Sequence, residues 1–346
     1  MNMASRIAII GRKNIIEASI DLVPGKEGWR VFIMGFIALV IGLTAFGFES
    51  GNLIGATSGL ADITGFPTGI AAVIVGAISF LAIVFSTPAF IEMIMKIFVV
   101  AMGLIFGITG IIVKPDVVEI FKGFIPTVPE GALVNTVALI GTTFIGINLV
   151  FHSVSSADKW DKEEHLEESY FDTNFNVIAG LIMTMALIIT NSAVLYQTGT
   201  VVDSPVVFSK SLEPVLGSWA RYFGDLGLIF AGLSSAIATP YMAGVIFGKI
   251  FKWEEENEFR IKLIATIVVI VGTLFAAFGA RPTQIILFAQ ATGGFFLPAI
   301  TILFVLAANN DNLGKYKNTT FQNILGAISI AVTFGLGMWT LYNIFF

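Results

Sequence analysis

Long runs of apolar residues, separated by short polar stretches, dominate the sequence. Nine of them are long enough for a membrane span, and they lie near residues 29–60, 66–89, 91–113, 132–154, 174–197, 219–248, 261–280, 282–307 and 322–345. A helix that crosses the hydrocarbon core of a bilayer needs about 20 mainly apolar residues. The pattern therefore predicts an all-α polytopic membrane protein with nine transmembrane helices.

The basic residues of the loops predict the orientation of these helices. A cytoplasmic N-terminus places most of the 19 Lys and Arg residues on the cytoplasmic face of a nine-span chain. An excess of Lys and Arg in cytoplasmic loops is typical of membrane proteins. We therefore predict a plasma-membrane protein with its N-terminus in the cytoplasm and its C-terminus outside.

The composition supports an integral membrane protein. Hydrophobic residues make up 56% of the chain and charged residues 12%, with a mean hydropathy of +0.88. The lipid bilayer is the expected environment, and a nucleic-acid partner is excluded. The chain has no cysteine, which excludes disulfides, thiolate metal sites and cysteine nucleophiles. Because no nucleophile and base are suitably spaced either, we expect neither an enzyme nor a bound cofactor.

Polar groups interrupt the fourth apolar run over residues 141–153. The stretch contains Thr142, Thr143, Asn148, His152 and Ser153, with glycines at Gly141 and Gly146. Glycine weakens a helix, and a local break frees backbone carbonyls that can coordinate a cation, as in the discontinuous helices of secondary transporters. His152, as a neutral imidazole, could carry protons. The alternative is a kinked packing helix whose Asn and His bond to neighbouring helices.

Three further polar residues lie inside apolar runs. Glu49 is a carboxylate within the first run, where it either moves protons or sits protonated in a structural hydrogen bond. Gln290 precedes Gly293, Gly294 and Pro298, and its amide oxygen suits either a cation or a bond to another helix. Asn191 is interpreted as structural.

The order and spacing of these residues resemble the natural resistance-associated macrophage protein (NRAMP) family of proton-coupled divalent metal transporters. The family's sixth helix commonly reads Gly-Ala-Thr-Val-Met-Pro-His-Asn-Leu-Tyr-Leu-His-Ser. The similarity to this helix rests on Ala138-Leu139-Ile140-Gly141-Thr142-Thr143, Asn148-Leu149 and His152-Ser153. Glu49 with Ile54-Gly55-Ala56 resembles the third helix, Asn191 the seventh, Leu216-Gly217 with Ala231-Gly232-Leu233-Ser234-Ser235 the eighth, and Gln290 with Leu297-Pro298 the tenth.

This resemblance implies a LeuT-type fold of inverted repeats, with residues 1–346 as one transmembrane domain. The stretch from Ser5 to Lys13 is similar to the end of the family's second helix, so the nine runs would be helices three to eleven. Residues 1–28 would be a cytoplasmic remnant of helix two and its loop, and the domain would be incomplete at its N-terminus. The Asp-Pro-Gly-Asn motif of the family's first helix is absent from the chain.

The resemblance also implies roles for single residues. Thr142 and Ile145 stand where the family has the Ala and Met that supply metal ligands, and Gly146 and Ile147 replace its Pro and first His. The implied metal site consists of Thr142, Ile145, Asn148 and Gln290, with a helix break at Gly141 and Gly146 and a proton pathway through Glu49 and His152. Loss of the soft Met thioether would shift selectivity towards harder cations such as Mg²⁺. The proton pathway is reduced too, because Phe46 replaces an acidic residue.

Two functions follow. The first is secondary-active transport of a divalent cation by alternating access around a site at the membrane midplane, with proton coupling. The alternative is a non-transporting fragment, scaffold or sensor, suggested by the missing first-helix motif. The sequence assigns no oligomeric state.

Overall fold

The computed structural model describes residues 1–346 apart from residues 86, 126, 128–144, 197–198, 200–206, 208–211, 254–257, 279–295 and 346. All regular secondary structure in the described residues is helical. The helices are α1 (Asn2–Gly11), α2 (Ile15–Ile20), α3 (Glu27–Thr64), α4 (Thr68–Phe85), α5 (Pro88–Val113), α6 (Val117–Lys122), α8 (Gly146–Lys159), α9 (Leu166–Asn191), α10 (Glu213–Leu216), α11 (Ala220–Ile250), α12 (Glu258–Ala277) and α14 (Thr320–Phe345). A π-helical turn (Ser192–Tyr196) follows α9, a further helix spans Phe296–Ala308, and a 3₁₀ segment (Asp311–Tyr316) precedes α14.

Local sequence signals set several helix ends. Asn14 accepts hydrogen bonds from the backbone N–H groups of Ile16 and Glu17, and Glu17 bonds back to Asn14 N, so α2 begins with a capping box. Thr87 caps α5, whose first residue is Pro88, a position where proline suits the helix because its missing N–H has no partner there. At the end of α3 the chain turns at Gly65 with φ 72°, a left-handed conformation that glycine adopts without strain.

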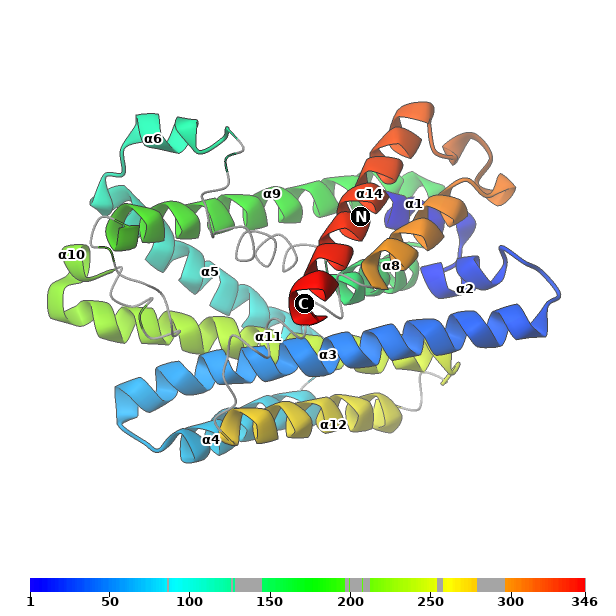
Figure 1. The fold of residues 1–346 in the computed structure, drawn as a ribbon. Helices are drawn as coiled ribbons and strands as arrows, with labels where there is room; N and C mark the ends of the chain where they lie inside the picture. The colour runs from blue at the N-terminus through cyan, green and yellow to red at the C-terminus, as the bar shows by residue number, and fades with distance from the viewer. Residues whose placement is uncertain are drawn as a thin grey trace.

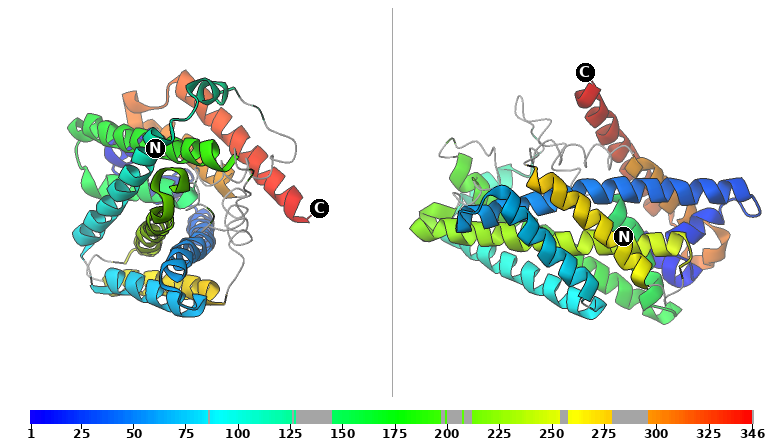
Figure 2. Two further views of the ribbon diagram at one scale, coloured as in Figure 1. Left: turned by 90° about the vertical axis from the view of Figure 1, so that its left-hand side faces the viewer. Right: turned by 90° about the horizontal axis from the view of Figure 1, so that it is seen from below.

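The helices α3 and α11 form the central pair of the molecule (Figure 1). On one side α4 and α12 pack against this pair, and on another side α11 packs against α5, which in turn contacts α9 (Figure 2). Glycines allow the close approach of α3 and α11: a Cβ atom on Gly232 would lie 2.6 Å from the Ala56 Cβ. Close contact through small residues is typical of helices that pack within a membrane.

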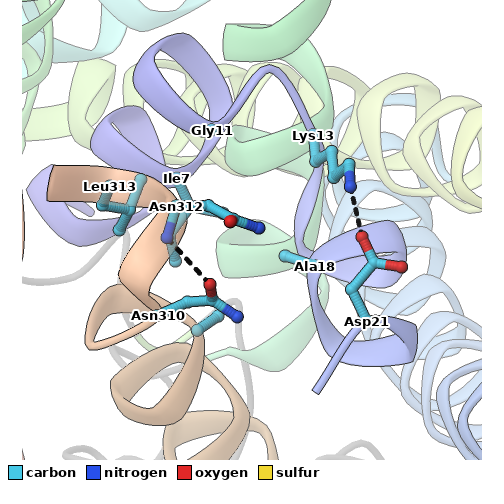
Figure 3. A pocket seen from close by; sticks show the side chains of 9 residues that line it. Ile7, Gly11, Lys13, Ala18, Asp21, Asn310, Asn312 and Leu313 are labelled. Atoms are coloured by element: carbon cyan, nitrogen blue, oxygen red, sulfur yellow. Dashed lines mark hydrogen bonds and ion pairs between the residues drawn. The ribbon is translucent and has the colours of Figure 1, made fainter. Parts of the chain in front are cut away.

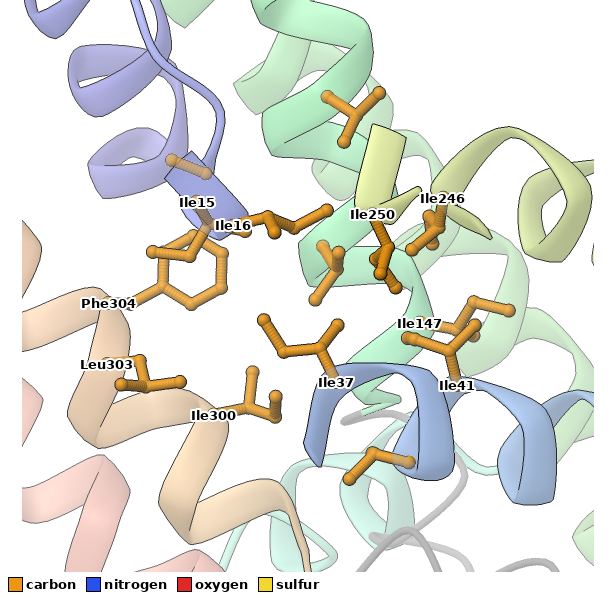
Figure 4. Packing of buried hydrophobic residues seen from close by; sticks show 14 of the residues in the cluster. Ile15, Ile16, Ile37, Ile41, Ile147, Ile246, Ile250, Ile300, Leu303 and Phe304 are labelled. Atoms are coloured by element: carbon orange, nitrogen blue, oxygen red, sulfur yellow. The ribbon is translucent and has the colours of Figure 1, made fainter. Parts of the chain in front are cut away.

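The largest hydrophobic core lies at one end of this pair (Figure 4). It joins α1, α2, α3, α8, α11 and the Phe296–Ala308 helix through buried side chains that include Ile15, Ile16, Ile37, Ile41, Ile147, Ile246, Ile250, Ile300, Leu303 and Phe304. Because α8 contributes Ile147, Val150 and Val154, this core fixes the helix that carries Asn148 and His152.

The predicted all-α membrane fold is confirmed in the described part of the chain. Five helices there are long and apolar enough to cross a membrane, namely Glu27–Thr64, Thr68–Phe85, Glu163–Leu195, Gly217–Ile250 and Glu258–Ala277. They coincide with five of the nine predicted spans. Two shorter apolar helices, Phe296–Ala308 and Thr320–Gly335, lie within the eighth and ninth. The third predicted span matches α5, and the fourth is described only from Ile145 onwards.

Candidate functional site

The helix α8 begins inside the core, in the middle of the predicted fourth span. Ile145 is extended, with φ −109° and ψ 121°, and the helix starts at Gly146 without a side-chain cap. The Ile145 carbonyl accepts hydrogen bonds from the backbone N–H groups of Asn148 at 3.1 Å and Leu149 at 3.4 Å. Ile145 itself is therefore not helical, whereas residues 128–144 lie outside the described part of the chain, so the helix break at Gly146 stays a prediction.

The structure describes only some of the predicted site residues. Those outside the described residues are Thr142, Gln290 and Gly141, the last of which is a predicted helix break. Their roles stay predictions. Ile145 and Asn148 are half-buried at the start of α8. Within the described residues, no three His, Asp or Glu side chains gather in a group that could hold a metal ion.

His152 links three helices. Its Nε2 atom lies 3.1 Å from the Ser5 Oγ on α1 and 3.3 Å from the Thr173 Oγ1 on α9. The next residue, Ser153, accepts a hydrogen bond from the Ile15 backbone N–H at the start of α2, at 2.8 Å. These contacts give His152 and Ser153 a packing role between helices. The role of His152 in a proton pathway stays a prediction.

Glu49 is fully buried in the middle of α3. Neither carboxyl oxygen receives a hydrogen bond from a donor among the described residues. Gly272 on α12 lies so close that an added Cβ would be 2.8 Å from the Glu49 Cγ. One turn along α3, the Asn52 Nδ2 atom lies 3.4 Å from the Thr239 Oγ1 on α11. A carboxylate in such surroundings is costly when charged, so the site favours a neutral Glu49.

The structure does not bring Glu49 and His152 together. Glu49 faces α12, whereas His152 faces α1 and α9, and no hydrogen bond or ion pair joins the two among the described residues. The two members of the predicted proton pathway therefore occupy different helix interfaces. Asn191, interpreted as structural, donates from Nδ2 to the Leu187 carbonyl one turn earlier, at 2.8 Å.

Among the described residues, cavities lie beside α1 and beside α8. A small one of about 20 Å³ lies between the α1–α2 corner and the Asp311–Tyr316 segment (Figure 3) and is lined in part by the ion-paired Lys13 and Asp21. Its volume is enough for one water molecule. A larger cavity of about 270 Å³ lies between α8 and α11 and is lined by residues that include Ser155, Asp158 and Tyr241. An ion pair of 2.7 Å between Asp158 and Lys249 joins the two helices beside it.

Sequence reasoning missed a second buried carboxylate. Asp225, near the start of α11, is fully buried, and the nearby Asp62 and Arg221 form an ion pair. The available signal was that Asp225 lies within an apolar run, where an ionisable residue is a candidate by default. Its position four residues after Arg221 made it resemble an ordinary helix-surface ion pair.

Comparisons with known proteins identify the family. The family model described as "Natural resistance-associated macrophage protein-like" matches residues 1–343. A divalent metal cation transporter MntH of Caldanaerobacter subterraneus is 25% identical over 94% of this chain and 77% of its own length. The MntH of Listeria monocytogenes serotype 4a is 24% identical over 100% of this chain and 79% of its own length.

The fold agrees with this family. A crystal structure of a mutant manganese transporter from Eremococcus coleocola superposes with a TM-score of 0.76 at 19% identity, covering 98% of this chain and 76% of that chain. The predicted LeuT-type transporter fold is thereby confirmed. From the family match over nearly its whole length, we conclude that the chain belongs to the Nramp family of integral membrane metal ion transporters.

Proposed function

We propose that this protein moves a divalent metal cation across the plasma membrane by secondary-active transport. The observation that carries the proposal is the start of α8 at Gly146, after an extended Ile145, in the middle of an apolar run. Substrate sites of LeuT-type transporters lie at such interruptions, where unwound backbone can coordinate a cation. The relatives from Caldanaerobacter and Listeria are named as divalent metal cation transporters, and the solved relative as a manganese transporter.

The proposed substrate site combines the backbone before Gly146 with side chains of two spans. The Thr142 carbonyl and the Gln290 amide oxygen supply hard oxygen ligands, Ile145 borders the ion, and Asn148 stabilises the break. Alternating access would expose this site to the two faces in turn. The cavity between α8 and α11 gives the ion a route towards the membrane face on which the N-terminus lies. We propose that this is the cytoplasmic face.

Uptake by the purified chain tests this function. The full chain, reconstituted into proteoliposomes, is expected to accumulate Mn²⁺ with saturable kinetics, and Mg²⁺ is supplied in parallel to measure selectivity. Empty liposomes provide the background. Accumulation no faster than this background for both ions would contradict transport and favour a scaffold or sensor.

The side chain at position 145 is expected to set the preference between soft and hard cations. A thioether at this position coordinates soft ions, and an isoleucine does not. Ile145→Met is therefore expected to strengthen competition by Cd²⁺ against Mn²⁺ uptake by about tenfold, which corresponds to about 1.4 kcal/mol. Ile147→Met, in the buried core of the same helix, is the matched control and should leave the competition unchanged. If both substitutions strengthened the competition by Cd²⁺ equally, the side chain at position 145 would not set the cation selectivity.

Proton coupling is proposed to depend on Glu49. Its buried carboxyl group can gain or lose a proton within the membrane, and a glutamine cannot. Glu49→Gln should therefore reduce the stimulation of Mn²⁺ uptake by an inward proton gradient by about fivefold or more, the usual size of coupling between two ligands. Glu27→Gln, at the exposed start of the same helix, is the control. If the proton gradient stimulated Mn²⁺ uptake by Glu49→Gln as strongly as uptake by the unaltered chain, Glu49 would not belong to the proton pathway.

A further inference from the structure

An ion pair joins the C-terminal ends of α8 and α11 beside the cavity between these two helices. Asp158 is the last residue but one of α8, and Lys249 holds the same position in α11. The Lys249 Nζ atom lies 2.7 Å from the Asp158 Oδ1 atom. The two helices therefore end side by side, and opposite charges link them there.

The ion pair lies on the two helix faces that line the cavity of about 270 Å³. The wall from α8 includes Ser155, and the wall from α11 includes Tyr241 and Val245. Asp158 follows Ser155 by three positions, and Lys249 follows Val245 by four. Residues at these spacings lie on the same face of a helix. The ion pair therefore spans the end of the cavity at which both helices stop.

Elsewhere α8 is held by contacts of a different kind. His152 contacts α1 and α9, and Ser153 binds the backbone at the start of α2. Val154 belongs to the main hydrophobic core, which Ile250 of α11 also reaches (Figure 4). Beyond this core the cavity separates the two helices. The ion pair is thus the contact that holds α8 and α11 together on the cavity side.

Asp158 is unfavourably placed for the stability of α8 alone. The C-terminal end of a helix carries a partial negative charge, which favours a cation and disfavours a carboxylate. The neighbouring Lys159 lies over the Trp160 ring, 4.3 Å from its centroid, so the carboxylate takes its partner from α11. The side chains of Asp158 and Lys249 are 52% and 32% exposed. An ion pair this accessible to water is weak and is screened by salt, so it can break and form again.

We propose that the Asp158–Lys249 ion pair is a latch that limits the opening of the cavity between α8 and α11. When the pair breaks, the ends of the two helices separate and larger solutes reach the cavity walls. When the pair forms again, the cavity narrows. During transport the latch opens to release the cation, and only this consequence rests on the proposed function.

A single introduced thiol tests the latch, because the chain has no cysteine of its own. Ser155→Cys places the thiol on the cavity wall. An uncharged polyethylene-glycol maleimide labels it in the full chain in detergent, and the bulk of this reagent makes its access depend on the width of the cavity. Adding Lys249→Met or Asp158→Asn should raise the labelling rate by about two- to fivefold, which corresponds to the loss of a partly exposed ion pair. Combining Asp158→Lys with Lys249→Asp should restore the original rate.

The two single substitutions separate opening of the cavity from a change in the reactivity of the thiol. Lys249→Met removes a positive charge and Asp158→Asn a negative one, so a purely electrostatic effect on the thiolate would move the two rates in opposite directions. Lys122→Met breaks an ion pair within α6 and should leave the rate unchanged. Opposite changes or no change in the two variants would overturn the proposal. Failure to label both Ser155→Cys and Val245→Cys, on the other wall, in every variant would overturn it too. Labelling does not require transport, so faster labelling without Mn²⁺ uptake would contradict only the proposed function.

Discussion

Replacing Gly232 with alanine is expected to destabilise the protein by about 2–3 kcal/mol. Gly232 lies where α11 crosses α3, and an added Cβ would be 2.6 Å from both the Ala56 Cβ and the Asn52 carbonyl oxygen, and 2.7 Å from the Ala56 backbone nitrogen. Backbone atoms cannot move aside as a flexible side chain can, so the two helices would have to separate. Overpacking of this kind typically costs about 1–3 kcal/mol, and the backbone contacts place this substitution at the upper end.

Gly55 offers a matched control on the partner helix. An added Cβ on Gly55 meets nothing within 4 Å, so Gly55→Ala should keep the packing and gain up to about 1 kcal/mol of helix propensity. Thermal unfolding of both variants in detergent, followed by circular dichroism, gives the comparison. If Gly232→Ala unfolded at the same temperature as Gly55→Ala, this result would contradict the close contact of α3 and α11 at this crossing.

The sequence predicted the fold well because the bilayer imposes a simple length rule on apolar runs. The boundaries of α3 and α11 lie within a few residues of the predicted spans at 29–60 and 219–248. The start of a helix at Gly146 was also foreseeable, because glycines flank a polar stretch there. The resemblance to the family then predicted how the helices are arranged in a LeuT-type fold, which apolar runs alone cannot show.

The contacts between helices could not be predicted in the same way. Lipid tails are as apolar as a leucine side chain, so lipid-facing and protein-facing stripes have similar compositions. The neighbours of His152 are an example: Ser5 is 147 positions away in the chain, and nothing in the local sequence links the two. The burial of Asp225 was missed for the same reason, since this residue alone resembles an ordinary charge near a helix end.

Arg6 on α1 provides the second large expected effect. Only 5% of this residue is exposed, and its guanidinium donates hydrogen bonds to the chain around the start of α14. The acceptors are the Tyr316 carbonyl at 3.1 Å, the Lys317 carbonyl at 3.4 Å, the Gln322 Oε1 at 2.9 Å and the Asn318 Oδ1. Because hydrogen bonds to charged groups contribute about 1.5–3 kcal/mol each and their loss leaves acceptors unsatisfied, Arg6→Met should destabilise the protein by about 3 kcal/mol.

The chemistry of the side chain separates this effect from a simple loss of charge. Lysine keeps the charge but places its donors on one nitrogen, so it cannot reach separate acceptors as the planar guanidinium does. Arg6→Lys should therefore recover only part of the loss. Arg30→Met, at a half-exposed arginine whose Nη1 atom lies 3.6 Å from the Glu27 Oε2, should change stability by about 0.5 kcal/mol or less. Thermal unfolding measures the ranking of the three variants. Limited proteolysis at residues 309–319 should be faster in Arg6→Met than in the unaltered chain and unchanged in Arg30→Met. Equal stability of Arg6→Met and Arg30→Met would show that Arg6 does not hold α1 against this segment.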